Sequence, residues 1–173
     1  MVVSYSADAG RPVYPPYCGC KDSKLAHFQR RGTYLRRVAE VLVHFFRCTR
    51  CMTHITMVPN TCVPYKHYPV REIEPCLDAV VRGRSAYAVD KHDSPGIHQS
   101  TIRRWLNQWI TNSALLASVA VEKFSRLISG DFRGVYQDLS DHYQSDQFLG
   151  DVQVDLCEWY PPVGIFRPLI VPS

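Results

Sequence analysis

The sequence predicts an α+β fold, in which a small three-stranded β region precedes a set of helices, and three observations support this prediction. Cys48 and Cys51 are separated by two residues and directly follow an alternating apolar run, as in a metal-binding turn that joins two strands. A second pair, Cys18 and Cys20, lies upstream at about the length of a hairpin. A basic segment with helical periodicity follows the cysteines and includes Arg103-Arg104-Trp105.

Composition limits the size and the class of the protein. The 173 residues, 46% of them hydrophobic, suit one domain or two very small ones and are too few for a large multidomain enzyme. Residues 1–16 lack a basic flank followed by an apolar core, so we expect no signal peptide, reduced cysteines and a cytoplasmic protein. The longest apolar run, around residues 114–121, is far shorter than the roughly 18 to 20 residues of a membrane span. We therefore expect no membrane partner.

Charge is distributed unevenly along the chain. Residues 1–113 contain 16 Lys and Arg against 8 Asp and Glu, a net charge of +8, whereas residues 114–173 contain 4 against 8, a net charge of −4. A basic half of this kind indicates a face that binds nucleic acid. The alternative is two solvated surfaces of opposite sign that attract each other.

The first unit is expected to be a flexible arm over residues 1–16. This segment mixes small and polar residues with three prolines, which favour extended backbone and cannot continue a helix. The following Cys18-Gly19-Cys20 makes a turn, in which Gly19 can take the positive φ that lets the backbone fold around an ion.

Three segments after this turn have the character of strands. Residues 25–38 mix aromatic, β-branched and basic side chains without helical periodicity, which predicts a twisted, largely exposed strand. Residues 40–48 alternate apolar side chains over the usual length of a strand and lead directly into Cys48. A third short strand, residues 54–58, leaves Cys51 and stops at Pro59-Asn60.

Residues 17–60 are therefore predicted to form a zinc ribbon, whose ion is held by Cys18, Cys20, Cys48 and Cys51. Four thiolates leave no open position for water, so we expect a structural zinc and no chemistry at the ion. A free cysteine also packs as a small hydrophobe, and this interpretation suits the three other cysteines.

Residues 66–113 are predicted to form a helix-turn-helix. Apolar residues recur at helical spacing from residue 68 to residue 81, and Pro75 places the start of this helix near residues 72–74, because proline is tolerated in a first turn. A second short helix is expected over residues 85–92, and Pro95-Gly96 then forces a turn. The third helix begins at Ser100, a suitable N-cap residue.

The third helix carries the side chains that read DNA. Its apolar side includes two tryptophans, whereas its other side carries Arg103, Arg104, Asn107 and Gln108. In helix-turn-helix proteins these residue types hydrogen-bond the edges of bases in the major groove. Any amphipathic surface helix also turns polar residues outward, and this alternative stays open.

The order and spacing of these motifs resemble a family of uncharacterised bacterial zinc-ribbon proteins related to insertion-sequence transposases. The resemblance covers about residues 15–113 and includes the turn that precedes the third helix. It is carried by Tyr17-Cys18-Gly19-Cys20, Gly32-x-Tyr34, Phe46-Arg47-Cys48-x2-Cys51, Val58-Pro59 and Ser100-Thr101-Ile102-Arg103-Arg104-Trp105. It implies a zinc ribbon followed by a helix-turn-helix that binds double-stranded DNA.

The first cysteine pair departs from the pattern of that family. Its usual form is Cys-x2-Cys, and the position of its first cysteine is Pro15 in this chain. Either Cys20 takes over as the ligand, or the site has decayed, or a nearby group such as His27, Asp22 or Cys62 completes it.

Two groups of residues are expected to contact DNA in different ways. If the third helix enters the major groove, base edges lie near Gln99, Arg103, Arg104 and Asn107. The basic hairpin is expected to meet phosphates through Arg30, Arg31, Arg36 and Arg37.

Residues 114–173 are predicted to form a helical tail with an extended strap at its end. Apolar residues recur at helical spacing over residues 114–129, which suits a core or the seam of a homodimer. The acidic residues between 131 and 158 suggest a two-metal nuclease site, but such sites need carboxylates held by a sizeable α/β fold, and this segment shows no run of buried strands.

These observations favour a zinc-dependent, transposase-related DNA-binding protein that has no catalytic domain and is not an enzyme. One alternative is an adaptor, in which the ribbon and the apolar helix bind a partner protein. Another is a truncated metal-dependent nuclease or transposase.

Overall fold

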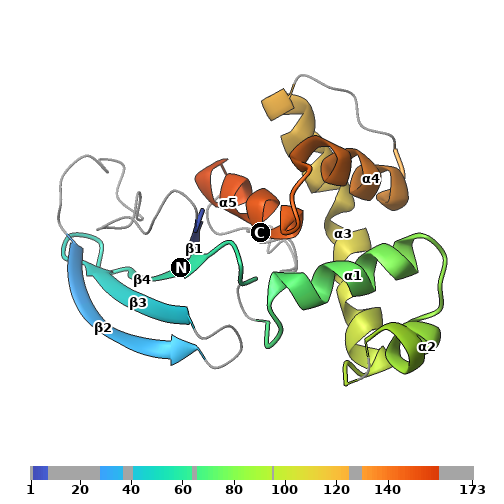
Figure 1. Cartoon of the computed structure of the whole chain (residues 1–173). Helices are drawn as coiled ribbons and strands as arrows, with labels where there is room; N and C mark the ends of the chain where they lie inside the picture. The colour runs from blue at the N-terminus through green and yellow to red at the C-terminus, as the bar shows by residue number, and fades with distance from the viewer. Residues whose placement is uncertain are drawn as a thin grey trace.

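The computed structural model describes residues 2–7, 28–36, 41–63, 66–94, 96–124 and 130–159. It has an α+β fold, in which a four-stranded sheet lies on one side and the helices lie on the other (Figure 1). In chain order the elements are β1 (Val2–Tyr5), β2 (Phe28–Arg36), β3 (Val41–Cys48), β4 (His54–Pro59), α1 (Val70–Val81), α2 (Ala86–Ala88), the π-helical turn η1 (Val89–Asp93), α3 (Gln99–Phe124), α4 (Phe132–Tyr143) and α5 (Phe148–Trp159).

The sheet has the strand order β1-β4-β3-β2. Strands β2, β3 and β4 pair antiparallel in sequence, and these are the three strands that the sequence predicts. The fourth strand differs from our expectation, because Val2–Tyr5 lies in the segment that we assigned to a flexible arm. It pairs parallel with β4, and the Asn60 N–H donates to the carbonyl oxygen of Tyr5 at 2.8 Å. A parallel neighbour has to return over a long connection, so no hairpin pattern in the sequence indicates it.

Alternate residues of β3 and β4 bury both faces of the sheet. Val43 and Val58 face one side, where they pack with Cys62. Because side chains alternate along a strand, the residues between them face the other side. Five buried residues occupy that second face, namely His44, Phe46, Cys48, Ile55 and Met57.

The helices enclose a separate and larger hydrophobic core. Trp105 and Trp109 of α3 are both fully buried there. The Trp109 ring meets the edge of Tyr136 from α4 with 5.2 Å between the ring centroids, and Tyr136 meets Phe148 of α5 at 5.0 Å. Helices α3, α4 and α5 are therefore joined by a continuous chain of aromatic contacts.

Helix α1 begins two to four residues before the predicted start. The Val70 N–H donates to the Thr61 carbonyl oxygen at 3.0 Å, which holds the first turn of α1 against the end of the β region. Pro75 therefore lies inside the helix rather than in its first turn. It removes one backbone hydrogen bond, and the burial of apolar residues on both sides of it, such as Ile73 and Leu77, offsets this loss.

Helix α3 is a single helix of 26 residues, although the sequence predicted two. The hydroxyls of Thr111 and Ser113 donate to the carbonyl oxygens of Asn107 and Ile110, so these polar residues are accommodated within the helix. The boundary that we predicted between residues 113 and 114 thus falls inside α3.

The N-terminus of α3 is also held differently from the prediction. Ser100 is the second helical residue rather than the N-cap. Its N–H donates to Nδ1 of His98 at 3.2 Å, and the Gln99 N–H donates to the Asp90 carboxylate at 3.0 Å. The turn before the helix and η1 together satisfy the first backbone donors of α3.

Asn60 connects the sheet to helix α5. Its side-chain oxygen accepts from the Ala7 N–H at 3.0 Å, and its Nδ2 donates to the Asp151 carboxylate at 2.6 Å. A Cβ at Gly150 would lie 1.8 Å from the Asn60 carbonyl oxygen, so only glycine allows α5 to pack this closely on the end of β4. Among the described helices, none combines the length and apolar character that a bilayer crossing needs.

Candidate nucleic-acid interface and cysteine turn

The buried face of α3 fixes the orientation of its exposed face. Ile102, Trp105 and Trp109 are fully buried, and Trp109 Nε1 donates to the Phe132 carbonyl oxygen at 3.0 Å. Because a tryptophan has a definite ring direction and a single donor, this bond holds α3 against rotation about its own axis. The polar side chains on the opposite face are therefore presented in a defined arrangement.

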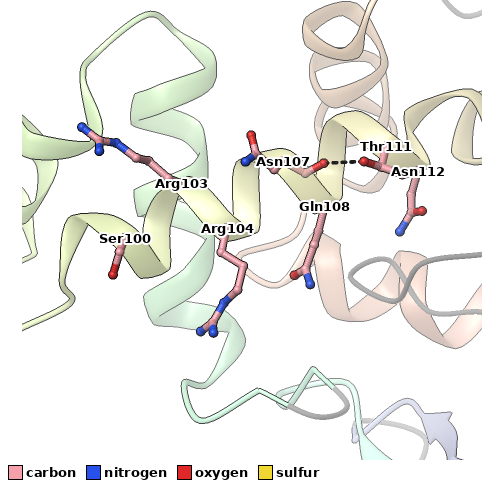
Figure 2. Close-up of a pocket in the computed structure, with 7 residues that line it drawn as sticks. All are labelled: Ser100, Arg103, Arg104, Asn107, Gln108, Thr111 and Asn112. Atoms are coloured by element: carbon pink, nitrogen blue, oxygen red, sulfur yellow. Dashed lines mark hydrogen bonds between the residues drawn. The ribbon is translucent and has the colours of Figure 1, made fainter.

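A concave surface with a volume of about 380 Å³ lies along the first four turns of this polar face. Figure 2 shows the described side chains that line it, which are Ser100, Arg103, Arg104, Asn107, Gln108, Thr111 and Asn112. None of these residues is acidic. Within the described part of the chain, Arg103 and Arg104 are both exposed and form no ion pair with a carboxylate. The surface is thus positively charged and rich in hydrogen-bond donors.

The lining side chains extend to two sides of α3. Ser100, Arg104 and Gln108 are four residues apart, and Figure 2 shows them extending to the same side of the helix. Arg103 extends to the opposite side (Figure 2). The two neighbouring arginines can therefore contact different parts of a ligand that lies along α3.

Lys66 supports one of these sides from the segment that precedes α1. The residue is only 9% exposed, and its Nζ donates to Oε1 of Gln108. Burial, followed by the nearby Arg104 guanidinium, lowers the pKa of Lys66 from 10.5 to about 8. A buried amine is thus held next to an exposed guanidinium, and both favour the approach of an anion.

The two amide side chains on this surface are engaged differently. The Gln108 oxygen accepts from Lys66, and among the described residues its Nε2–H₂ group has no partner and can donate to a ligand. The Asn107 residue accepts from Thr111 through its backbone carbonyl oxygen, the bond drawn in Figure 2. In the described part of the chain, the Asn107 side-chain amide keeps both its donor and its acceptor available.

The structure brings together three of the four residues that we predicted to read bases. Arg103, Arg104 and Asn107 share the concave surface, whereas Gln99 is not among the described residues that line it. Gln99 is half-buried at the start of α3. Lys66 and the role of Gln108 were missed, because the contact between them joins residues 42 positions apart.

The predicted phosphate-binding arginines lie elsewhere in the molecule. Arg30, Arg31 and Arg36 belong to β2, the edge strand that Figure 1 places farthest from the helices. The pairing of β2 with β3 shifts between Arg30 and Gly32, so a bulge presents Arg31, which is exposed. Arg37 lies outside the described residues.

The turn at Cys48 and Cys51 has a geometry that suits a metal ligand pair. The Cys51 N–H donates to the sulfur of Cys48 at 3.4 Å, and the Cys48 N–H donates to the Thr53 carbonyl oxygen at 3.0 Å. Met52 has a φ of 59°, a left-handed conformation that is uncommon for a residue other than glycine and closes the turn tightly. A backbone donor directed at sulfur stabilises negative charge there, as a zinc-bound thiolate requires.

The remaining predicted ligands, Cys18 and Cys20, lie outside the described residues. Over the parts of the chain that the structure describes, no group of three or more His, Cys, Asp or Glu residues is placed to hold a metal ion. Cys62 does not complete the site, because it packs with Val43 on the face of the sheet opposite to Cys48.

Most acidic residues of the tail lie on helices, and none of the described ones lies at a strand end. Asp138 and Asp141 belong to α4, whereas Asp151 and Asp155 belong to α5. Their bonds serve the fold, since Asp151 accepts from Asn60 and Asp155 accepts from the Tyr143 hydroxyl. These contacts offer no support for a two-metal nuclease site.

Comparison with known proteins identifies the family of the chain. A family model described as a domain of unknown function (DUF6431) matches residues 15–105. This range runs from the first predicted cysteine turn into the first turns of α3. No curated protein and no solved structure matches the chain.

Proposed function

We propose that this chain, which belongs to the family described as a domain of unknown function (DUF6431), is a zinc-dependent DNA-binding protein related to the DNA-binding region of insertion-sequence transposases. It binds double-stranded DNA without cleaving it. The observation that carries this proposal is the concave surface of α3, which is lined by Arg103, Arg104 and Asn107 and has no carboxylate among its described lining residues. Such a surface attracts phosphate and offers the donors that recognise base edges.

In this proposal α1, the α2–η1 segment and α3 form a helix-turn-helix. Gly96 has a φ of 108° in the turn before α3, which allows the chain to reverse sharply between the two helices. The buried tryptophans support the first half of α3 as a recognition helix, because they hold its polar face outward. The arginines of β2 then contact phosphates at a second position along the duplex.

Zinc has a structural role in this proposal. Cys48 and Cys51 supply two thiolates from a turn that already directs a backbone donor at sulfur, and Cys18 and Cys20 supply the other two. The ion would stabilise the β3–β4 hairpin at its turn, which Cys48 and Cys51 begin.

The proposal predicts binding to duplex DNA that depends steeply on salt and is not accompanied by cleavage. If about six phosphates are contacted, the association constant falls roughly 10³-fold between 50 mM and 200 mM salt. Fluorescence anisotropy with a labelled duplex measures this slope. The double variant Arg103→Ala/Arg104→Ala should lose most of the binding, whereas Arg133→Ala on α4 removes an exposed charge elsewhere and should change little.

An adaptor that binds a partner protein is the second candidate function. Ile110 and Val121 of α3 are 41% and 40% exposed, which leaves apolar surface beside the polar face. Val121 also belongs to residues 114–129, the segment that we predict as the seam of a homodimer. Binding that ignores salt, or strand cleavage in magnesium, would contradict the DNA-binding proposal.

A second prediction concerns the metal. Protein prepared without chelator should contain one zinc ion per chain, and Cys48→Ser or Cys51→Ser should release it, because each change removes a thiolate ligand. Metal analysis by mass spectrometry checks the content.

Two further variants identify the rest of the ligand set. Cys62→Ala is the matched control and should retain the ion, because Cys62 lies on the opposite face of the sheet. Cys20→Ala should lose it, and retention would show that another group is the fourth ligand. Absence of zinc from the unmodified protein would contradict the zinc ribbon itself.

A further inference from the structure

We infer that the two sides of the α3 surface bind different parts of DNA: Arg104 and Gln108 contact a backbone phosphate, whereas Arg103 and Asn107 face the bases. Lys66 acts as a positioning residue for the phosphate site. This inference rests on the proposed DNA-binding function and assigns different DNA contacts to the two neighbouring arginines.

The hydrogen-bonding state of the two amides separates the two sides. An adenine edge presents a donor next to an acceptor, and an amide that reads it needs both of its own groups. Asn107 meets this requirement, because its side-chain amide is not engaged within the described chain. Gln108 is less suited to it, since its Oε1 already accepts from Lys66, which occupies one of the two lone pairs of that oxygen and leaves the N–H₂ group as the part that donates.

A phosphate group matches what Gln108 and Arg104 offer together. Phosphate oxygens accept hydrogen bonds and do not donate them, so a site made only of donors suits phosphate better than a base edge. Arg104 contributes a guanidinium with five N–H donors, and Gln108 lies one turn further along on the same side of α3 (Figure 2). Ser100, one turn before Arg104, places a hydroxyl on the same side, where it is hydrogen-bonded to Nδ1 of His98 at 2.8 Å.

Lys66 holds the phosphate site in a fixed geometry, because it links a surface side chain to a buried residue. Lys66 is a buried residue, 9% exposed, and its ammonium is hydrogen-bonded to Gln108, so it fixes which way the amide points. It also places a second positive charge near Arg104, and the two cations repel each other until an anion lies between them or beside them. A bound phosphate relieves this repulsion.

The inference predicts different effects for the two arginines on DNA binding. Arg104→Ala should weaken binding to every sequence about 10-fold and reduce the salt slope by about one, because one phosphate contact is lost. Lys66→Met should weaken all sequences in the same way, since the Gln108 amide is then free to turn. Arg103→Ala should instead relax the preference at one position of the selected site. Selection from a random duplex pool, followed by salt titrations, measures both effects.

Titration with inorganic phosphate provides a test that does not depend on DNA. At constant ionic strength, the side-chain amide signal of Gln108 in ¹H–¹⁵N spectra should shift and saturate. Arg104→Ala should abolish the shift and Arg103→Ala should preserve it. Backbone signals in the same spectra report whether each variant is folded.

The two experiments distinguish failure of this inference from failure of the proposed function. If the unmodified protein binds no DNA but Gln108 responds to phosphate, the DNA-binding proposal is wrong and the anion site stands. If DNA binds and Arg104→Ala changes base preference with an unaltered salt slope, Arg104 reads a base and the inference is overturned. A Gln108 signal that ignores phosphate overturns it as well.

Discussion

Replacing Trp105 by alanine is expected to lower the free energy of unfolding by about 3 to 5 kcal/mol. The side chain is fully buried between the helices, and its ring meets the edge of Tyr68 with 5.3 Å between centroids. Alanine would leave a large cavity at the point where α3 rests on the segment before α1, and the surrounding helices can close it only in part. Urea denaturation followed by circular dichroism measures the change.

The control for this experiment is an aromatic residue that does not pack in the core. Tyr87 is 54% exposed, and Tyr87→Ala should change the free energy of unfolding by no more than about 0.5 kcal/mol. A Trp105→Ala variant as stable as the unmodified protein would show that α3 does not rest on this tryptophan. The stability measurement also helps to interpret the DNA experiments. A loss of DNA binding in Trp105→Ala would result from the damaged fold and not from a lost DNA contact.

The second large effect is expected from the pH dependence of stability and is due to Glu74. This residue of α1 is 8% exposed, and its carboxylate oxygen accepts from the Leu149 N–H at 2.7 Å near the start of α5. Burial is the main cause that raises the pKa of Glu74 from 4.5 to about 8, and the nearby Asp151 and Asp146 raise it further, while the bond from Leu149 opposes the change. The folded protein therefore holds a neutral carboxylic acid here at a pH where the unfolded chain is ionised.

The sign of the effect follows from this difference between the folded and unfolded states. Because the folded pKa is raised, the stabilisation that Glu74 provides is complete below about pH 4.5 and is lost as the pH rises to about 8. The loss is about 1.4 kcal/mol per pH unit within this window, or up to about 5 kcal/mol in all.

Glu74→Gln is the variant that isolates this contribution. Its amide oxygen can still accept from the Leu149 N–H, but the side chain does not ionise in this pH range. The variant should show a flatter dependence of unfolding free energy on pH between 5 and 8 and should exceed the unmodified protein in stability near pH 8. Glu72→Gln, an exposed change in the same helix, should leave the pH dependence unaltered. If the unfolding free energies of Glu74→Gln and the unmodified protein changed with pH in parallel, the raised pKa of Glu74 would be contradicted.

Local patterns in the sequence were sufficient to predict the strands β2, β3 and β4 and the helix α1. The alternation of apolar residues along β3 depends only on a period of two, and the helical spacing of Ile102, Trp105 and Trp109 depends only on the period of the α-helix. Both patterns remain visible in a single segment. For the same reason, the sequence identified the polar face of α3 and the turn at Cys48 and Cys51 before any contact between elements was known.

The tertiary structure decided which of these segments meet. The bond from Lys66 to Gln108 joins residues 42 positions apart, and the bond from Leu149 to Glu74 joins residues 75 positions apart. Glu74 occupies a position that reads as polar and exposed in the sequence, and only the approach of α5 buries it. The parallel pairing of β1 with β4 likewise depends on contact between segments that are far apart in the sequence.

The sequence by itself determined an α+β chain, its three antiparallel strands and the residues of the polar face of α3. Only the tertiary structure decided that Gln108 is already engaged while the Asn107 amide has no partner among the described residues, and hence that two adjacent amides differ in what they can bind. The physical reason is that periodicity records which side of an element is apolar, whereas the state of a donor or acceptor depends on the group that another part of the chain places against it.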